Sequence, residues 1–149
     1  MVWEKMTRKF VVGMVAASIA CTGIADNQKD DPNYYRPSSY KMTKAAKVTV
    51  TIPSKRNDYD PKEDCKTFVV RQRHAVFFFS HAKPVSESTR MHESDFSSCE
   101  ADGTIRFVDG DTGKWTIKRN GIAYLEILNG NSKGQVVILH CKKCEDWDL

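Results

Sequence analysis

The last third of the chain alternates apolar and polar residues in short segments, and this pattern constrains the fold more than any other feature. The alternating segments are 104–107, 114–118, 122–128 and 136–140. Asn120-Gly121 stands between two of them and is a strong signal for a tight hairpin turn, because both residues tolerate a positive φ. Alternating segments joined by short turns pair with their neighbours in sequence. The pattern therefore predicts an antiparallel meander of four strands.

The middle of the chain adds further β-rich segments. Residues 48–52 alternate valine and isoleucine with threonine, and Pro53 is expected to end that strand. The runs 68–70 and 75–79 are apolar and are separated by residues 71–74, which predicts a hairpin. One helical turn is expected at 87–93, and no longer helix. These segments predict an all-β domain, a small antiparallel sandwich or barrel of about seven strands. The expected core is Phe77, Phe79, Phe107, Trp115, Leu125, Ile127 and Val136.

The beginning of the chain has the features of a cleavable secretory signal. Basic residues near the start are followed by 16 uncharged residues, Phe10–Ala25, and then by a polar run that begins at Asp26. This uncharged run is shorter than the roughly 20 apolar residues of a membrane span. We therefore expect a signal peptide at 1–25, a polar tether at 26–45 and a single β domain at 46–149. The tyrosines of the tether, Tyr34, Tyr35 and Tyr40, are interpreted as linker residues, and the alternative is that they rest on the domain.

Cys21 offers a second interpretation of the export segment. Ile19 and Ala20 before this cysteine resemble a bacterial lipidation motif, although Ser18 stands where an aliphatic residue is usual. Cleavage before Asp26 predicts a periplasmic or secreted protein. Lipidation of Cys21 predicts an anchor in the outer membrane, and this lipid is the only membrane contact that the pattern indicates.

The charge of the chain gives no support for nucleic-acid binding. Residues 1–25 hold three of the 23 Lys and Arg residues and one of the 19 Asp and Glu residues, which leaves a net charge of about +2 on the remainder. Nucleic-acid-binding domains usually carry a clustered basic face. The pairs at Lys55-Arg56 and at Arg71 and Arg73 are small basic spots that attract an anionic partner only weakly.

Four cysteines remain after the export segment, and in an exported protein they predict disulfides. Four cysteines allow three pairings. We favour pairing Cys65 and Cys99 with the C-terminal cysteines, which would fix the tail to the domain. The other option joins Cys65 to Cys99 and Cys141 to Cys144. The spacing of Cys141 and Cys144 also fits a thiol redox site or half of a zinc site.

No residues form a recognised catalytic, metal or cofactor motif. His81 and His92 bracket the long polar stretch 81–98, but no metal-ligand spacing connects them, and its serines lack the G-x-S-x-G frame of a hydrolase. Asp109-Gly110-Asp111 fits a turn and lacks the further ligands of a calcium loop. A polar loop of this length in a small domain is often functional. The candidate binding residues in it are His81, Lys83, Arg90, His92 and Glu93.

These features predict an exported bacterial envelope protein that is a binding module rather than an enzyme. Its expected partner is another protein, as for an inhibitor or an immunity protein, and no cofactor is expected. One alternative is a thiol redox or metal-binding protein that uses Cys141 and Cys144. A second alternative is a structural component of a surface assembly.

Overall fold

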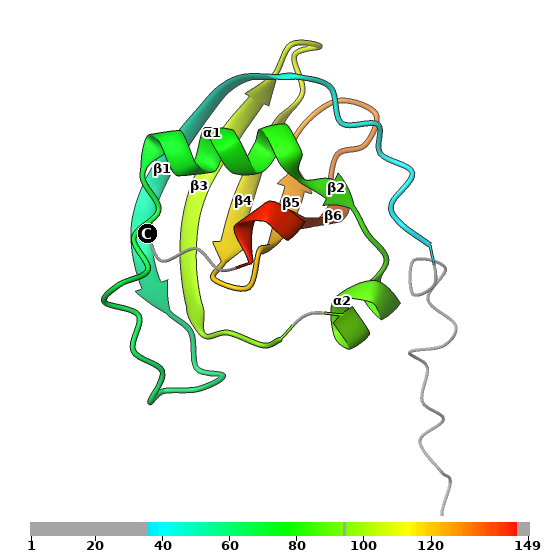
Figure 1. Cartoon of the computed structure of the whole chain (residues 1–149). Helices are drawn as coiled ribbons and strands as arrows, with labels where there is room; N and C mark the ends of the chain where they lie inside the picture. Colours follow the sequence, from blue (N-terminus) through cyan, green and yellow to red (C-terminus); the bar gives the residue numbers. More distant parts are fainter. Residues whose placement is uncertain (1–35, 94, 146–149) are drawn as a thin grey trace, which may run out of the picture.

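The computed structural model describes residues 36–93 and 95–145, and these residues form one six-stranded antiparallel sheet with a helix across one face (Figure 1). The strand order is β1-β3-β4-β5-β6-β2. The strands are β1 (Ala45–Arg56), β2 (Lys83–Pro84), β3 (Cys99–Phe107), β4 (Thr112–Lys118), β5 (Ile122–Ile127) and β6 (Val136–His140). The helices are α1 (Gln72–His81), α2 (Glu87–Glu93) and the short 3₁₀ helix η2 (Lys142–Cys144). The described part of the chain is thus mostly β, as predicted.

The predicted four-strand meander is confirmed as β3 to β6. Each of these strands pairs antiparallel with the next, and Trp115 of β4 lies between Gly103 of β3 and Leu125 of β5. Gly121 in the β4–β5 turn has a φ of 77°, the left-handed conformation that glycine adopts without strain. The hairpin signal at Asn120-Gly121 therefore specifies a real turn.

The core lies between the sheet and α1. Alternate residues of the central strands, among them Ile105, Trp115 and Leu125, are buried on the face that α1 covers, whereas their polar neighbours point to the other face. The Trp115 indole donates a hydrogen bond from Nε1 to the Thr104 carbonyl at 3.0 Å. Its ring lies so close to Gly103 that a Cβ there would come within 2.1 Å of it. Glycine at this position therefore makes room for the largest core side chain.

The predicted hairpin at 68–79 is wrong, because this segment contains α1. Ala75, Phe78 and Phe79 are buried and recur at helical spacing, and Phe79 contacts the Trp115 ring at a centroid distance of 5.9 Å. A short continuous apolar run does not distinguish a strand from a buried helix by periodicity alone. The expectation that the domain has no helix longer than one turn is wrong for the same reason, because α1 has ten residues. The turn predicted at 87–93 is confirmed as α2.

Five of the seven predicted core residues are buried, and two are not. Phe77 lies on the outer side of α1 and is 40% exposed, while Val136 is 55% exposed on the open face of the sheet. The predicted end of the first strand at Pro53 is also wrong. β1 continues to Arg56 with an irregularity between Ile52 and Lys55, as a proline permits on an edge strand.

The segment before β1 contacts the domain. Tyr40 is 7% exposed, its ring lies 6.2 Å from that of Phe107, and its hydroxyl donates to an Asp111 carboxylate oxygen at 3.1 Å. Interpreting Tyr40 as a linker residue is therefore wrong. The predicted signal peptide, Cys21 and Tyr34 and Tyr35 lie outside the described residues. None of the helices in the described ranges is long and apolar enough to cross a membrane.

Candidate binding surface

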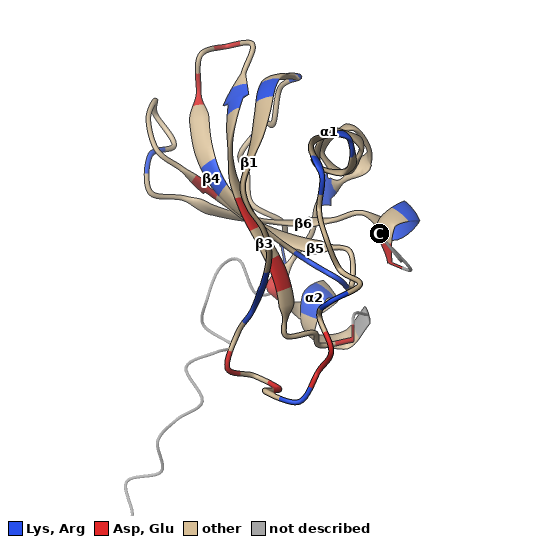
Figure 2. Cartoon of the chain, turned by 90° about the vertical axis from the view of Figure 1, so that its left-hand side faces the viewer, with Lys and Arg blue, Asp and Glu red and all other residues tan. Residues whose placement is uncertain are grey.

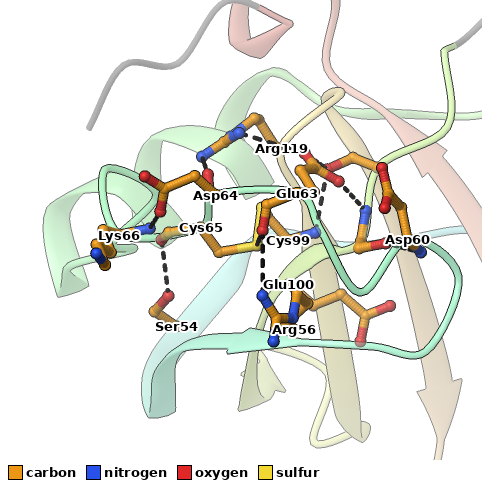
Figure 3. The surroundings of a disulfide bond; sticks show 12 residues. Ser54, Arg56, Asp60, Glu63, Asp64, Cys65, Lys66, Cys99, Glu100 and Arg119 are labelled. Atoms are coloured by element: carbon orange, nitrogen blue, oxygen red, sulfur yellow. Dashed lines mark hydrogen bonds and ion pairs between the residues drawn. A yellow bond between two sulfur atoms is a disulfide. The ribbon is translucent and has the colours of Figure 1, made fainter.

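The disulfide Cys65–Cys99 joins the loop after β1 to the first residue of β3 (Figure 3). Cys141 pairs with Cys144, so the favoured pairing of the body cysteines with the tail is wrong. The reason is the sheet topology. β1 and β3 are antiparallel neighbours, and the loop that leaves the end of β1 at Arg56 returns past the start of β3. Cys65 therefore meets Cys99, whereas the tail closes on itself.

Glu63 adds polar links between the same two segments. Its carboxylate accepts hydrogen bonds from the Ser97 hydroxyl at 2.8 Å and from the Ser98 backbone, and forms an ion pair with Arg119 at 3.2 Å. Arg119 also donates to the Asp64 carbonyl at 2.8 Å (Figure 3). Together with the disulfide, these contacts hold the 57–67 loop against the 95–99 segment.

Two exposed aromatic side chains face each other on these two segments. Tyr59 is 66% exposed and Phe96 is 50% exposed, and their ring centroids lie 5.4 Å apart. The Tyr59 backbone amide donates to the Asn57 side-chain oxygen at 2.9 Å, so a local turn fixes the backbone that carries this ring. Aromatic pairs at this separation attract each other, but burial against a partner would add more.

Arg90 of α2 extends this exposed pair. Its guanidinium carbon lies 5.6 Å from the centroid of the Phe96 ring, within the range of a cation–π contact. Glu87 accepts a hydrogen bond from the Arg90 Nε at 3.0 Å and holds the side chain in place. We call Tyr59, Phe96 and Arg90 the Tyr59–Phe96 surface. A small cavity of about 20 Å³ beside it is lined by Arg90, Phe96, Lys118 and Tyr124, among others.

Of the five predicted binding residues, only Arg90 lies on this surface. His81 ends α1, where its ring stacks on Phe77 at 4.1 Å, and Lys83 lies on β2 opposite His140. His92 is an exposed residue of α2, and the side chain of Glu93 is outside the described part of the structure. The stretch 81–98 therefore does not form one loop, because β2 and α2 divide it.

Tyr59 and Phe96 were not predicted as site residues. Each is a single aromatic residue in a polar, turn-rich segment, and 37 positions separate them in the sequence printed here. In the folded domain, the β1–β3 pairing, the Cys65–Cys99 disulfide and the Glu63 contacts bring these segments together. The sequence offers one signal that these segments meet, namely the pairing of Cys65 with Cys99 among the three possible disulfide pairings.

The cysteines of the alternative redox site are buried. Cys141 and Cys144 are both 0% exposed, and α1 packs against η2, which carries Cys144. Thiol–disulfide exchange requires a partner thiolate to reach one sulfur in line. The arrangement therefore suits a structural bridge at the end of β6.

Several acidic residues and histidines of the described part of the chain have structural roles. No group of three or more His, Cys, Asp or Glu in this part of the chain is placed to hold a metal ion. His140 contacts the Glu145 carboxylate at 2.5 Å, and Asp109 and Asp111 accept hydrogen bonds from Thr43 and Tyr40. These side chains therefore have structural partners.

Comparisons with known proteins give no relative. No protein-family model, curated protein or solved structure matches the chain significantly.

Proposed function

We propose that this chain is an exported bacterial envelope protein that binds a protein partner through the Tyr59–Phe96 surface. The observation that carries the proposal is the exposed Tyr59–Phe96 pair, with Arg90 against it, on segments fixed by a disulfide. Tyrosine, other aromatic residues and arginine are the side chains most enriched at the centres of protein interfaces.

Rigidity of the surface supports this proposal. A partner gains more affinity from a preformed surface, because fewer side chains and loops lose freedom on binding. The disulfide, the Glu63 contacts and the Glu87–Arg90 pair fix the surface before a partner binds. An inhibitor-like or immunity-like module would use a surface of this kind.

The proposal includes a location in the envelope. The chain would be periplasmic, secreted or anchored by a lipid on Cys21. Two disulfides support it, because disulfides persist in oxidising compartments. The alternative of a thiol redox protein is less well supported, since both cysteines of the Cys141–Cys144 pair are buried.

Paired alanine substitutions test the proposed surface. Proteins captured by the wild-type chain from envelope extract would be purified, and the affinity of each for the wild-type chain and for Tyr59→Ala/Phe96→Ala would be measured by calorimetry. We expect the double variant to bind at least about 30-fold more weakly, because aromatic residues at interface centres contribute 2 kcal/mol or more.

Phe77→Ala is the matched control, because Phe77 is also a partly exposed aromatic residue but lies on α1. It should leave the affinity unchanged, and circular dichroism should show that both variants remain folded. Equal affinity of the Tyr59→Ala/Phe96→Ala variant and the wild type would refute the surface. Self-association of the chain in light scattering, with no captured partner, would instead favour a surface-assembly component.

A further inference from the structure

The open face of the sheet, which α1 does not cover, carries two basic side chains directly opposite each other. Lys47 of β1 pairs with Arg106 of β3 in the antiparallel register, so both side chains point to the same face. This is the open face, because Arg106 alternates with Ile105 and Phe107, which are buried in the core. Figure 2 shows α1 on one side of the sheet and, for the described residues, no helix beside the upper part of the other side. Like charges in opposite positions repel each other, so this pair destabilises the sheet.

A third basic residue, Lys114 of β4, lies on the same face. It pairs with Thr104, two residues before Arg106, and is therefore a diagonal neighbour of Arg106. Lys47, Arg106 and Lys114 are all exposed, and none of them forms an ion pair or a side-chain hydrogen bond within the described part of the chain. The fold therefore gathers positive charge here without supplying its counterion.

The carboxylates of the adjacent β3–β4 turn do not supply that counterion. Asp111 accepts a hydrogen bond from the Tyr40 hydroxyl at 3.1 Å, and Asp109 accepts one from the Thr43 hydroxyl at 2.9 Å. These contacts hold both carboxylates against the segment before β1. Neither of them forms an ion pair with Arg106.

The carboxylates on the open face itself differ from one strand to the next. Those of β3 are paired with Lys55 or Lys118. Glu126 of β5 lies opposite Lys114 in the β4–β5 register and is exposed, but it forms no ion pair or hydrogen bond within the described residues. The open face therefore has excess positive charge at its β1–β3 end and an unpaired carboxylate on β5.

Two cavities follow this face and share Thr104 as a lining residue. The first, of about 330 Å³, is lined by Lys47, Thr49, Thr104, Arg106 and Thr112, among others. The second, of about 510 Å³, is lined by Thr51, Thr104, Lys114, Thr116, Tyr124 and Glu126, among others. Both volumes lie in the range of small-ligand sites. We call Lys47, Thr49, Thr104, Arg106, Lys114 and Glu126 the Arg106 groove.

We propose that the Arg106 groove binds a saccharide that carries an anionic group, either a carboxylate or a phosphate. Arginine and lysine bind such groups through charge-assisted hydrogen bonds, and the planar guanidinium can form two parallel ones. A bound anion would also offset the repulsion between Lys47 and Arg106. This repulsion is present before the ligand arrives, so the β1–β3 end of the groove already favours an anion.

The rest of the groove matches the hydroxyl groups of a sugar. The hydroxyls of Thr49 and Thr104 form no hydrogen bond within the described structure, and a hydroxyl can both donate and accept. The Glu126 carboxylate only accepts, so it requires a donor, which a sugar hydroxyl supplies and a bare anion does not. The groove contains no residue of the Tyr59–Phe96 surface, and this proposal does not rest on the proposed function.

Nuclear magnetic resonance titration of the isotope-labelled full chain tests the ligand class. The probes are glucuronate, glucose phosphorylated at its primary hydroxyl, unmodified glucose, acetate and inorganic phosphate. We expect at least one of the two anionic sugars to shift the amide signals of Thr49, Thr104 and Lys114 in a saturable way. Glucose, acetate and inorganic phosphate should each bind at least about tenfold more weakly, because each makes only part of the contacts. The tighter of the two anionic sugars identifies the anionic group.

Arg106→Gln should bind the preferred sugar at least about tenfold more weakly, because charge-assisted hydrogen bonds are lost. Arg73→Gln is the matched control, because it makes the same change at an exposed residue of α1, on the other face of the sheet. It should leave the affinity unchanged. Thermal unfolding should show that Arg106→Gln is at least as stable as the wild type, since the repulsion from Lys47 is removed. A loss of affinity then reports on the groove and not on folding.

Glu126→Ala separates a saccharide site from a simple anion site. This substitution removes an acceptor for sugar hydroxyls and also removes a charge that repels anions. We expect the preferred sugar to bind at least about threefold more weakly and inorganic phosphate to bind no more weakly than to the wild type. Tighter binding of both probes would contradict the proposal.

The proposal would be overturned if neither anionic sugar gave a saturable shift, or if glucose, acetate or inorganic phosphate bound as tightly as the anionic sugars. Equal affinity of Arg106→Gln and Arg73→Gln would also overturn it, as would an oligonucleotide that bound through Arg106 when neither sugar did. Tyr59→Ala/Phe96→Ala should bind the sugar like the wild type, and Arg106→Gln should bind a captured protein partner like the wild type. Either proposal can therefore fail without the other.

Discussion

At the scale of single residues, Glu100 is the most informative polar side chain of the fold. It is only 8% exposed, on the face of β3 that α1 does not cover. Its carboxylate lies 2.9 Å from the Lys118 ammonium and 3.5 Å from that of Lys55, and it accepts a hydrogen bond from Asn57. Burial alone would raise the pKa of Glu100, but the hydrogen bonds from Lys118 and Asn57 and the two ammonium charges lower it overall.

A lowered pKa makes the stability of the domain depend on pH. Because the pKa of Glu100 is lower in the folded chain than in the unfolded chain, its contribution is full above the unfolded pKa of about 4.3 and is lost as pH falls below it. We expect Glu100→Gln to lower the free energy of unfolding by about 1–2 kcal/mol at pH 7. The difference from the wild type should shrink between about pH 5 and pH 3.

Urea unfolding at several pH values measures this difference. Glu126→Gln provides the control, because Glu126 is an exposed carboxylate on the neighbouring part of the same sheet face. The Glu126→Gln substitution should change the free energy of unfolding by less than about 0.5 kcal/mol at every pH tested. A difference between wild type and Glu100→Gln that stays constant or widens toward pH 3 would show that Glu100 is not held ionised by these contacts.

At the scale of elements, the sequence predicts local pairing well. The strands 104–107, 114–118, 122–128 and 136–140 are all present, because alternation and glycine-containing turns are properties of adjacent residues. Helix α1 was missed because Val76 and Phe77 make its outer side apolar as well as its inner side. The resulting run lacks the amphipathic period by which a surface helix is recognised.

The disulfide pairing and the Tyr59–Phe96 surface depend on contacts between distant parts of the chain. Cys65 and Cys99 are separated by 34 positions, and nothing local indicates that their loops meet. That meeting follows from the pairing of β1 with β3, which places the end of β1 next to the start of β3. Predicting it requires the strand order, which alternation of residues does not specify.

The two disulfides should stabilise the domain unequally. A crosslink lowers the entropy of the unfolded chain more when it closes a longer loop, and the sequence separations here are 34 and 3. We expect Cys65→Ser/Cys99→Ser to lower the free energy of unfolding by about 4 kcal/mol, and Cys141→Ser/Cys144→Ser by about 2 kcal/mol. Guanidinium unfolding of both double variants measures this. Equal losses, or a larger loss for the C-terminal pair, would contradict the loop-entropy explanation.

At the scale of the whole molecule, the proposed function depends on where the domain acts. The Tyr59–Phe96 surface lies where the end of β1 meets the start of β3, on segments joined by the Cys65–Cys99 disulfide. Disulfides persist in oxidising compartments. The proposed function therefore requires that the chain reaches the envelope.

The mass of the intact protein from a bacterial host tests that requirement. Export with cleavage before Asp26 should yield a chain that lacks residues 1–25 and is lighter, by four hydrogen atoms, than its reduced form, since two disulfides are present. Lipidation would instead yield a chain that begins at Cys21 with added acyl mass. An Ala25→Leu variant is the control, because a bulky residue before the cut should block cleavage at Asp26. Recovery of wild-type chains that retain residues 1–25 with all five cysteines reduced would rule out export and, with it, the proposed place of action.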